Sequence, residues 1–77
     1  SDKDEQGNVY NPGKNLLLNT KDTLLRVPED KLVVVKDLED YIIIDEPDVL
    51  LIFPKSKEQE IKAVTARVKD EFGADFL

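Results

Sequence analysis

Short apolar runs recur along the middle of this chain at a nearly constant spacing. The runs begin 8 or 9 residues apart and occupy residues 16–18, 24–25, 32–35, 41–44 and 49–53. Valine and isoleucine dominate two of them, and the four prolines fall between or just after runs. This pattern is typical of short strands separated by turns. We therefore predict a β-rich region over residues 15–55.

Several of these runs are continuous rather than alternating between apolar and polar residues. Val33, Val34 and Val35 follow one another directly, as do Ile42, Ile43 and Ile44. A sheet with one wet face alternates, whereas a continuous run indicates that both faces are covered. One helix can cover only one face. The other face therefore requires a coiled or folded-over sheet, or a partner outside this chain.

A helix is predicted over residues 56–72. Ser56 is a candidate N-cap, with Gln59 three residues later as its capping-box partner, and Gly73 is placed to end the helix. One face carries an apolar stripe at helical spacing, formed by Ile61, Val64, Val68 and Phe72. We expect this stripe to pack on the core, with a dimer seam as the alternative.

Residues 1–14 are polar and contain turn signals, so they are predicted to be a linker or edge segment that ends at most in a short strand. The fold class that follows is α+β, a single domain over residues 1–77. About five to six short strands, in a short β-helix-like or folded sheet, precede one C-terminal helix. The side chains predicted to pack are Leu32, Val34, Ile42, Ile44, Leu50, Ile52, Ile61, Val64 and Val68.

The composition limits the chemistry that this chain can perform. It has no cysteine and no histidine, which removes thiolate metal sites and the commonest general base near neutral pH. The net charge is −6, and residues 22–48 hold nine acids against three bases. We therefore expect neither nucleic acid nor an anionic membrane as a partner.

The first residues and the length of the apolar runs bear on the cellular location of the protein. No apolar run approaches the 18 residues or so of a membrane span, and the charged first residues do not resemble a signal peptide. We expect a soluble, cytoplasmic protein. Methionine is absent even at position 1, so we expect a fragment of a longer protein.

The acidic turns are the candidate site for a divalent cation, which prefers several convergent oxygens. They contain Asp37, Glu39, Asp40, Asp45, Glu46 and Asp48, without EF-hand spacing or a central glycine. Paired carboxylates at 45–48 also suggest acid/base chemistry, but no nucleophile or oxyanion donor is identifiable beside them. Solvated turns, one of them fixed by Pro47, are the preferred interpretation. No catalytic, cofactor-binding or metal-binding residue is assigned.

Residues 31–62, KLVVVKDLEDYIIIDEPDVLLIFPKSKEQEIK, resemble the C-terminal region of mannose-1-phosphate guanylyltransferases. In that family a run like LVAVVGLEDLVVVDTPDALLV leads to a helix like QEVKKVVEELK. The resemblance covers about residues 7–72, with turn, strand and helix in the same order. Lys36 and Glu46 depart from it, standing where glycine and threonine are usual.

The resemblance implies a parent enzyme that makes GDP-mannose and diphosphate from GTP and mannose 1-phosphate with Mg²⁺. Catalysis would belong to an N-terminal domain whose glycine-rich signature lies outside this chain, so no catalytic residue carries over. The implied role is packing, and the implied partners are this N-terminal catalytic domain and a homodimer partner. The alternative is a non-catalytic interaction module of an unrelated protein, and a free-standing acid/base enzyme is a third hypothesis.

Overall fold

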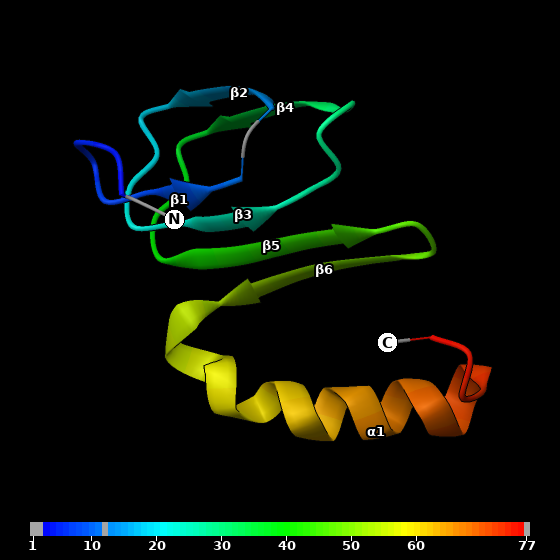
Figure 1. Ribbon diagram of the computed structural model, residues 1–77. Coiled ribbons are helices and arrows are strands. Elements are labelled where there is room, and N and C mark those ends of the chain that lie inside the picture. Colours follow the sequence, from blue (N-terminus) through cyan, green and yellow to red (C-terminus); the bar gives the residue numbers. More distant parts are fainter. Residues whose placement is uncertain (1–2, 12, 77) are drawn as a thin grey trace.

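The computed structural model describes residues 3–11 and 13–76 and shows six strands followed by a helical segment (Figure 1). The strands are β1 (Val9–Tyr10), β2 (Lys14–Leu18), β3 (Leu24–Arg26), β4 (Leu32–Lys36), β5 (Tyr41–Glu46) and β6 (Val49–Pro54). A 3₁₀ helix, η1 (Lys55–Glu60), leads into the α-helix α1 (Ile61–Phe72). The predicted α+β fold class is confirmed. The segment predicted as linker holds β1 and the first residue of β2.

The strands form two sheets, between which the chain passes back and forth. Sheet A has the order β1-β3-β5-β6 and sheet B the order β2-β4. Pairing is parallel except between β5 and β6, which form a hairpin. Lys14 pairs with Leu32, and Leu24 pairs with Ile42, so each partner lies 18 residues further along the chain. Two steps of the 8-to-9-residue spacing therefore make one coil.

Sheet B, sheet A and α1 are stacked as three layers, with sheet A in the middle (Figure 1). This arrangement explains the continuous apolar run of β5, because strands of sheet A have a neighbouring layer on each side, whereas the run of β4 in sheet B keeps one side exposed. In β5, Ile42 is buried, and Ile43 and Ile44, which point to opposite faces, are both half-buried. The predicted folded-over sheet therefore closes one face, and the helix partly closes the other.

The core is small and partly polar. Its buried apolar residues are Leu25, Val27 and Ile42, and buried beside them are Asn8, Thr20 and Thr23. A chain of this length buries only about 60% of the surface that its unfolded form exposes. A core of this size leaves a thin margin of stability.

Four side chains predicted to pack are exposed instead, which corrects the prediction. Leu32, Val34, Leu50 and Ile52 all retain more than half of their accessible surface. Burial alternates along β4, where Val33 and Val35 are half-buried and face inward while their neighbours face out. The prediction chose the wrong alternate positions on β4 and β6, because a run that is apolar at every position does not reveal which side faces the core.

The helix begins differently from the prediction. Neither η1 nor α1 has a side-chain capping hydrogen bond, so the predicted capping box of Ser56 and Gln59 is not formed. Lys57 interrupts the first turns with non-helical angles, φ −113° and ψ 17°, which prevents the regular first turn that a capping box requires. No helix in the described residues is long and apolar enough to span a bilayer.

The end of the helix matches its prediction. Gly73 follows Phe72 with φ 101°, and its N–H donates to the Lys69 carbonyl at 3.0 Å. A residue without a Cβ adopts this conformation at little cost, so the glycine ends the helix. The apolar stripe is covered unevenly. Ile61, Val64 and Val68 are half-buried, but Phe72 is 70% exposed, so its predicted packing is wrong.

Candidate interaction surfaces

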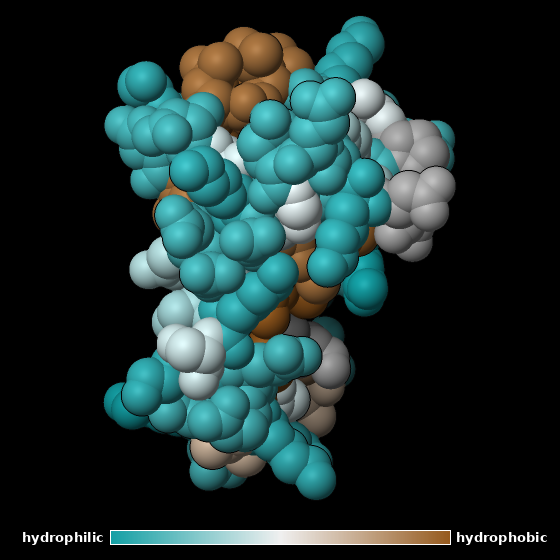
Figure 2. Space-filling model, turned by 90° about the vertical axis from the view of Figure 1, so that its left-hand side faces the viewer, coloured by the Kyte–Doolittle hydropathy of each residue, from teal (hydrophilic) through white to brown (hydrophobic). Residues whose placement is uncertain are grey.

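The outward side of sheet B carries the largest group of exposed aliphatic side chains. We call it the outer sheet-B face, and its members are Leu16, Leu18, Leu32 and Val34, which are 40% to 62% exposed. They gather because β2 and β4 pair in parallel with Leu16 directly beside Val34, and alternate residues of a strand share one side. Figure 2 shows a hydrophobic cluster at this end of the molecule.

Two lysines extend this face at opposite corners. Lys14 pairs with Leu32, and Lys36 pairs with Leu18, so both lysines share the outward side with the aliphatic residues. Both are exposed. The outer sheet-B face is therefore an aliphatic surface with a basic edge, on a chain whose net charge is negative.

A second apolar surface is concave and lies between the β5–β6 hairpin and the start of α1. We call it the hairpin–helix groove, and its volume is about 460 Å³. Its lining consists of Ile44, Glu46, Pro47, Asp48, Val49, Leu51, Ile61 and Thr65. Ile44 pairs with Leu51 in the hairpin, which places both on the side of sheet A that faces the helix. The floor of the groove is therefore aliphatic.

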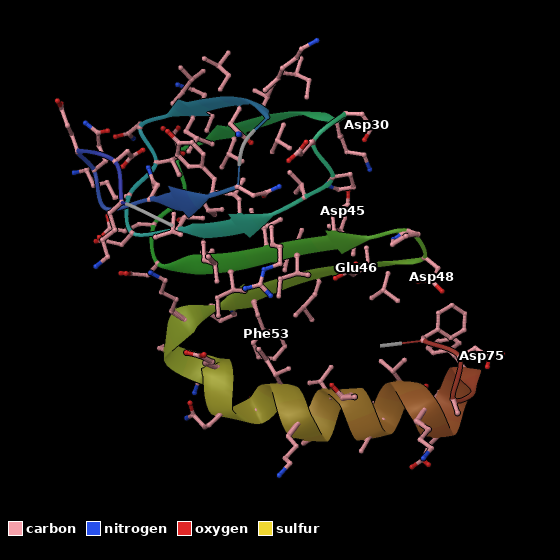
Figure 3. All side chains as sticks on the ribbon, viewed as in Figure 1. Asp30, Asp45, Glu46, Asp48, Phe53 and Asp75 are labelled. Atoms are coloured by element: carbon pink, nitrogen blue, oxygen red, sulfur yellow. The ribbon has the colours of Figure 1, made fainter. Side chains whose placement is uncertain are left out.

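The acids of the hairpin differ in their surroundings, although they are adjacent in sequence. Asp45 lies 2.5 Å from the Lys31 ammonium group. Glu46 and Asp48 are exposed at the groove, and within residues 3–11 and 13–76 neither forms an ion pair. Figure 3 shows these three side chains around the tip of the hairpin. The groove therefore has an acidic rim.

The candidate cation residues do not form one cluster. Glu39 and Asp40 lie with Asp22, with one carboxylate oxygen from each within 4.8 Å of the others, and all three are exposed. Asp37 instead accepts a hydrogen bond from the Asn19 amide at 2.7 Å. Asp22 was missed, although it precedes Asp40 by the 18 residues of one coil, and that offset is the signal that would have found it.

These acids are positioned by the turns that join the sheets. Asn19 and Asp37 both have φ near 50–60°, as do Asp22 and Asp40, and each pair is one coil apart. Asparagine and aspartate tolerate this left-handed conformation better than other residues with a side chain. The turn geometry accounts for the position of these acids, and their interpretation as solvated turns stays a prediction.

A network of polar groups holds the first coil to the second. The Asn8 amide nitrogen donates to the Thr20 carbonyl at 2.8 Å, and its oxygen accepts the Thr23 N–H at 3.0 Å. The Asp4 carboxylate accepts the backbone N–H groups of Asn8 and Gln6, both at 2.9 Å. The hydrogen bond from the Asn8 backbone contributes most to lowering the Asp4 pKa below its ordinary value of 3.8. Sequence reasoning missed this network.

The fold and its surfaces define a class: a small α+β module of two coiled sheets and a helix, with exposed apolar surfaces on both sides. No protein-family profile matches the chain. It is 33% identical over 76 residues to the C-terminal region of a Vibrio cholerae serotype O1 protein described as "Putative mannose-1-phosphate guanylyltransferase". The match covers 99% of this chain and 16% of that protein.

A solved structure contains a region with a similar fold. The crystal structure titled mannose-1-phosphate geranyltransferase, from Thermus thermophilus, matches with a TM-score of 0.70 at 23% sequence identity. The match covers 87% of this chain and 20% of that one. The resemblance to the C-terminal region of mannose-1-phosphate guanylyltransferases is confirmed, and the chain spans only about a sixth to a fifth of the length of these proteins.

Proposed function

We propose that this chain is the C-terminal assembly domain of a mannose-1-phosphate guanylyltransferase-like enzyme. The parent enzyme would convert GTP and mannose 1-phosphate to GDP-mannose and diphosphate with Mg²⁺, in the cytoplasm, on an N-terminal catalytic domain. The present domain, a short parallel β-helix with a helical tail, would contribute packing rather than chemistry. Its partners would be that catalytic domain and a second subunit.

The observation that carries this proposal is the outer sheet-B face. Four aliphatic side chains lie side by side there and keep about half of their surface in water. Burying the exposed part of each would contribute about 1 kcal/mol, so the face offers about 4 kcal/mol to a surface that covers it. That amount is comparable to the whole stability of many small domains. A face of this kind is suited to permanent contact with another domain or subunit.

The test uses the full-length parent protein. We expect GTP-dependent formation of GDP-mannose from mannose 1-phosphate, together with a dimer in light scattering. Leu16→Lys combined with Val34→Lys should weaken the assembly, because both lysines would lie in the centre of the outer sheet-B face. Leu50→Lys combined with Ile52→Lys is the matched control, since both residues are similarly exposed but lie on β6.

Two results would contradict the proposal. A full-length protein that is inert with GTP and mannose 1-phosphate would favour the alternative, a non-catalytic interaction module of an unrelated protein. An active enzyme whose oligomeric state and thermal stability are unchanged by the double substitution would show that the outer sheet-B face is not a packing surface.

A further inference from the structure

The hairpin–helix groove lies on the opposite side of sheet A from sheet B, so it is separate from the outer sheet-B face (Figure 1). The hairpin forms one wall through Ile44 and Leu51, and α1 forms the other through Ile61. These three side chains are half-buried, which means that the chain itself does not fill the space between them. A volume of about 460 Å³ is within the range of about 300–1,000 Å³ that is usual for binding pockets.

The floor of the groove has little to offer a polar ligand. Among the lining residues Thr65 carries the uncharged polar side chain, and its hydroxyl already donates to the Ile61 carbonyl at 2.9 Å. Affinity at the floor must therefore come from burying apolar groups. A small polar substrate would lose its hydration there without gaining hydrogen bonds in return.

The rim of the groove sets the charge of its occupant. Glu46 and Asp48 border it, and no lysine or arginine is among its lining residues in the described part of the chain. Lys31, which lies near the hairpin, is engaged by Asp45. Carboxylates that border a groove and have no partner cations are complementary to lysine or arginine side chains. Charge complementarity of this kind sets the orientation and specificity of an interface.

We propose that the hairpin–helix groove receives a basic, aliphatic segment of the enzyme's N-terminal catalytic domain. An aliphatic side chain of that segment inserts between Leu51 and Ile61, and flanking lysine or arginine residues pair with Glu46 and Asp48. This inference rests on the proposed function, because it takes the catalytic domain as the partner. The assembly domain is then held from two sides, by its aliphatic outer face and by its acidic groove.

Hydrogen exchange on the full-length enzyme, measured by mass spectrometry, tests this inference. The groove variant combines Glu46→Lys with Asp48→Lys, and the matched control combines Glu58→Lys with Asp70→Lys, which makes the same charge change on exposed positions of the helical segment. In the groove variant we expect exchange to rise several-fold in β6 and in the first turn of α1. We also expect it to rise in one lysine- or arginine-containing segment of the catalytic domain.

High salt should reproduce this loss of protection in the unmodified enzyme, because salt screens pairs at the rim. It should have little further effect on the groove variant. Faster exchange confined to the hairpin itself, with none in the catalytic domain, would overturn the inference, as would equal exchange in the groove variant and the control. An active enzyme with either of these results retains the proposed function and loses only the groove partner, whereas an inert enzyme refutes the proposed function itself.

Discussion

Asn8 offers the sharpest test of how the two coils are held together. The side chain is 1% exposed and bonds to the backbone carbonyl of Thr20 and the backbone N–H of Thr23. Asn8→Ala removes both hydrogen-bonding groups of this side chain at once. The substitution leaves the Thr20 carbonyl and the Thr23 N–H buried and unpaired. Each unpaired buried group costs about 1–3 kcal/mol, so the substitution should lower the free energy of unfolding by about 2–6 kcal/mol.

A loss of that size is large for so small a chain, since domains are stable by only about 5–15 kcal/mol and small ones lie at the low end. Urea denaturation followed by circular dichroism gives the comparison. Asn15→Ala is the matched control, because among residues 3–11 and 13–76 the Asn15 amide oxygen is buried without a partner and its nitrogen has only a 3.5 Å contact to the Asn11 carbonyl. Removing Asn15 should change the unfolding free energy by less than about 1 kcal/mol. Equal losses in the two variants would refute the role assigned to Asn8.

Two further predictions concern the core and the pH dependence of stability. Ile42→Ala should lower the unfolding free energy by about 2–5 kcal/mol because Ile42 is buried, whereas Ile52→Ala should cost less than about 1 kcal/mol because Ile52 is exposed, and urea denaturation compares the two. Asp4 has a lowered pKa in the folded state, so its contribution is fully present above pH 3.8 and is lost as the pH falls through the lowered value. NMR titration of its carboxyl group should give a midpoint below 3.8, and a midpoint at or above 3.8 would show that the hydrogen bonds from Asn8 are not formed.

The strands could be predicted from the sequence, but the faces that they bury could not. The spacing of the apolar runs located every strand from β2 to β6. In β4, however, Leu32 and Val34 are as apolar as Val33 and Val35, and only the position of sheet A decides which pair turns inward. The alternate residues of a strand that face the core can be predicted when polar residues occupy the side that faces water. On the outer sheet-B face that marker is missing, because the outward positions are themselves aliphatic.

The polar part of the core was missed for a related reason. Asn8 directly precedes β1, and Thr20 and Thr23 lie between β2 and β3, in connecting segments where asparagine and threonine are ordinary turn residues. Nothing in their local sequence separates an exposed turn from one that stacks on the next coil. The 18-residue offset identifies only the exposed turns that repeat, since Asn19 and Asp22 recur as Asp37 and Asp40 with the same backbone conformation. A repeat that preserves conformation more than residue type is easily overlooked in one sequence.

The two exposed surfaces differ in charge, and that difference bears on how an assembly of this module is specified. The outer sheet-B face ends in Lys14 and Lys36, and the hairpin–helix groove is bordered by Glu46 and Asp48. A partner that fits one surface by charge is disfavoured at the other, so the charges oppose an exchange of partners between the two sides. With a core of so few buried apolar side chains, much of the stability would then depend on contacts outside this chain. In the proposed enzyme, loss of docking should therefore lower the stability of the module itself as well as its attachment.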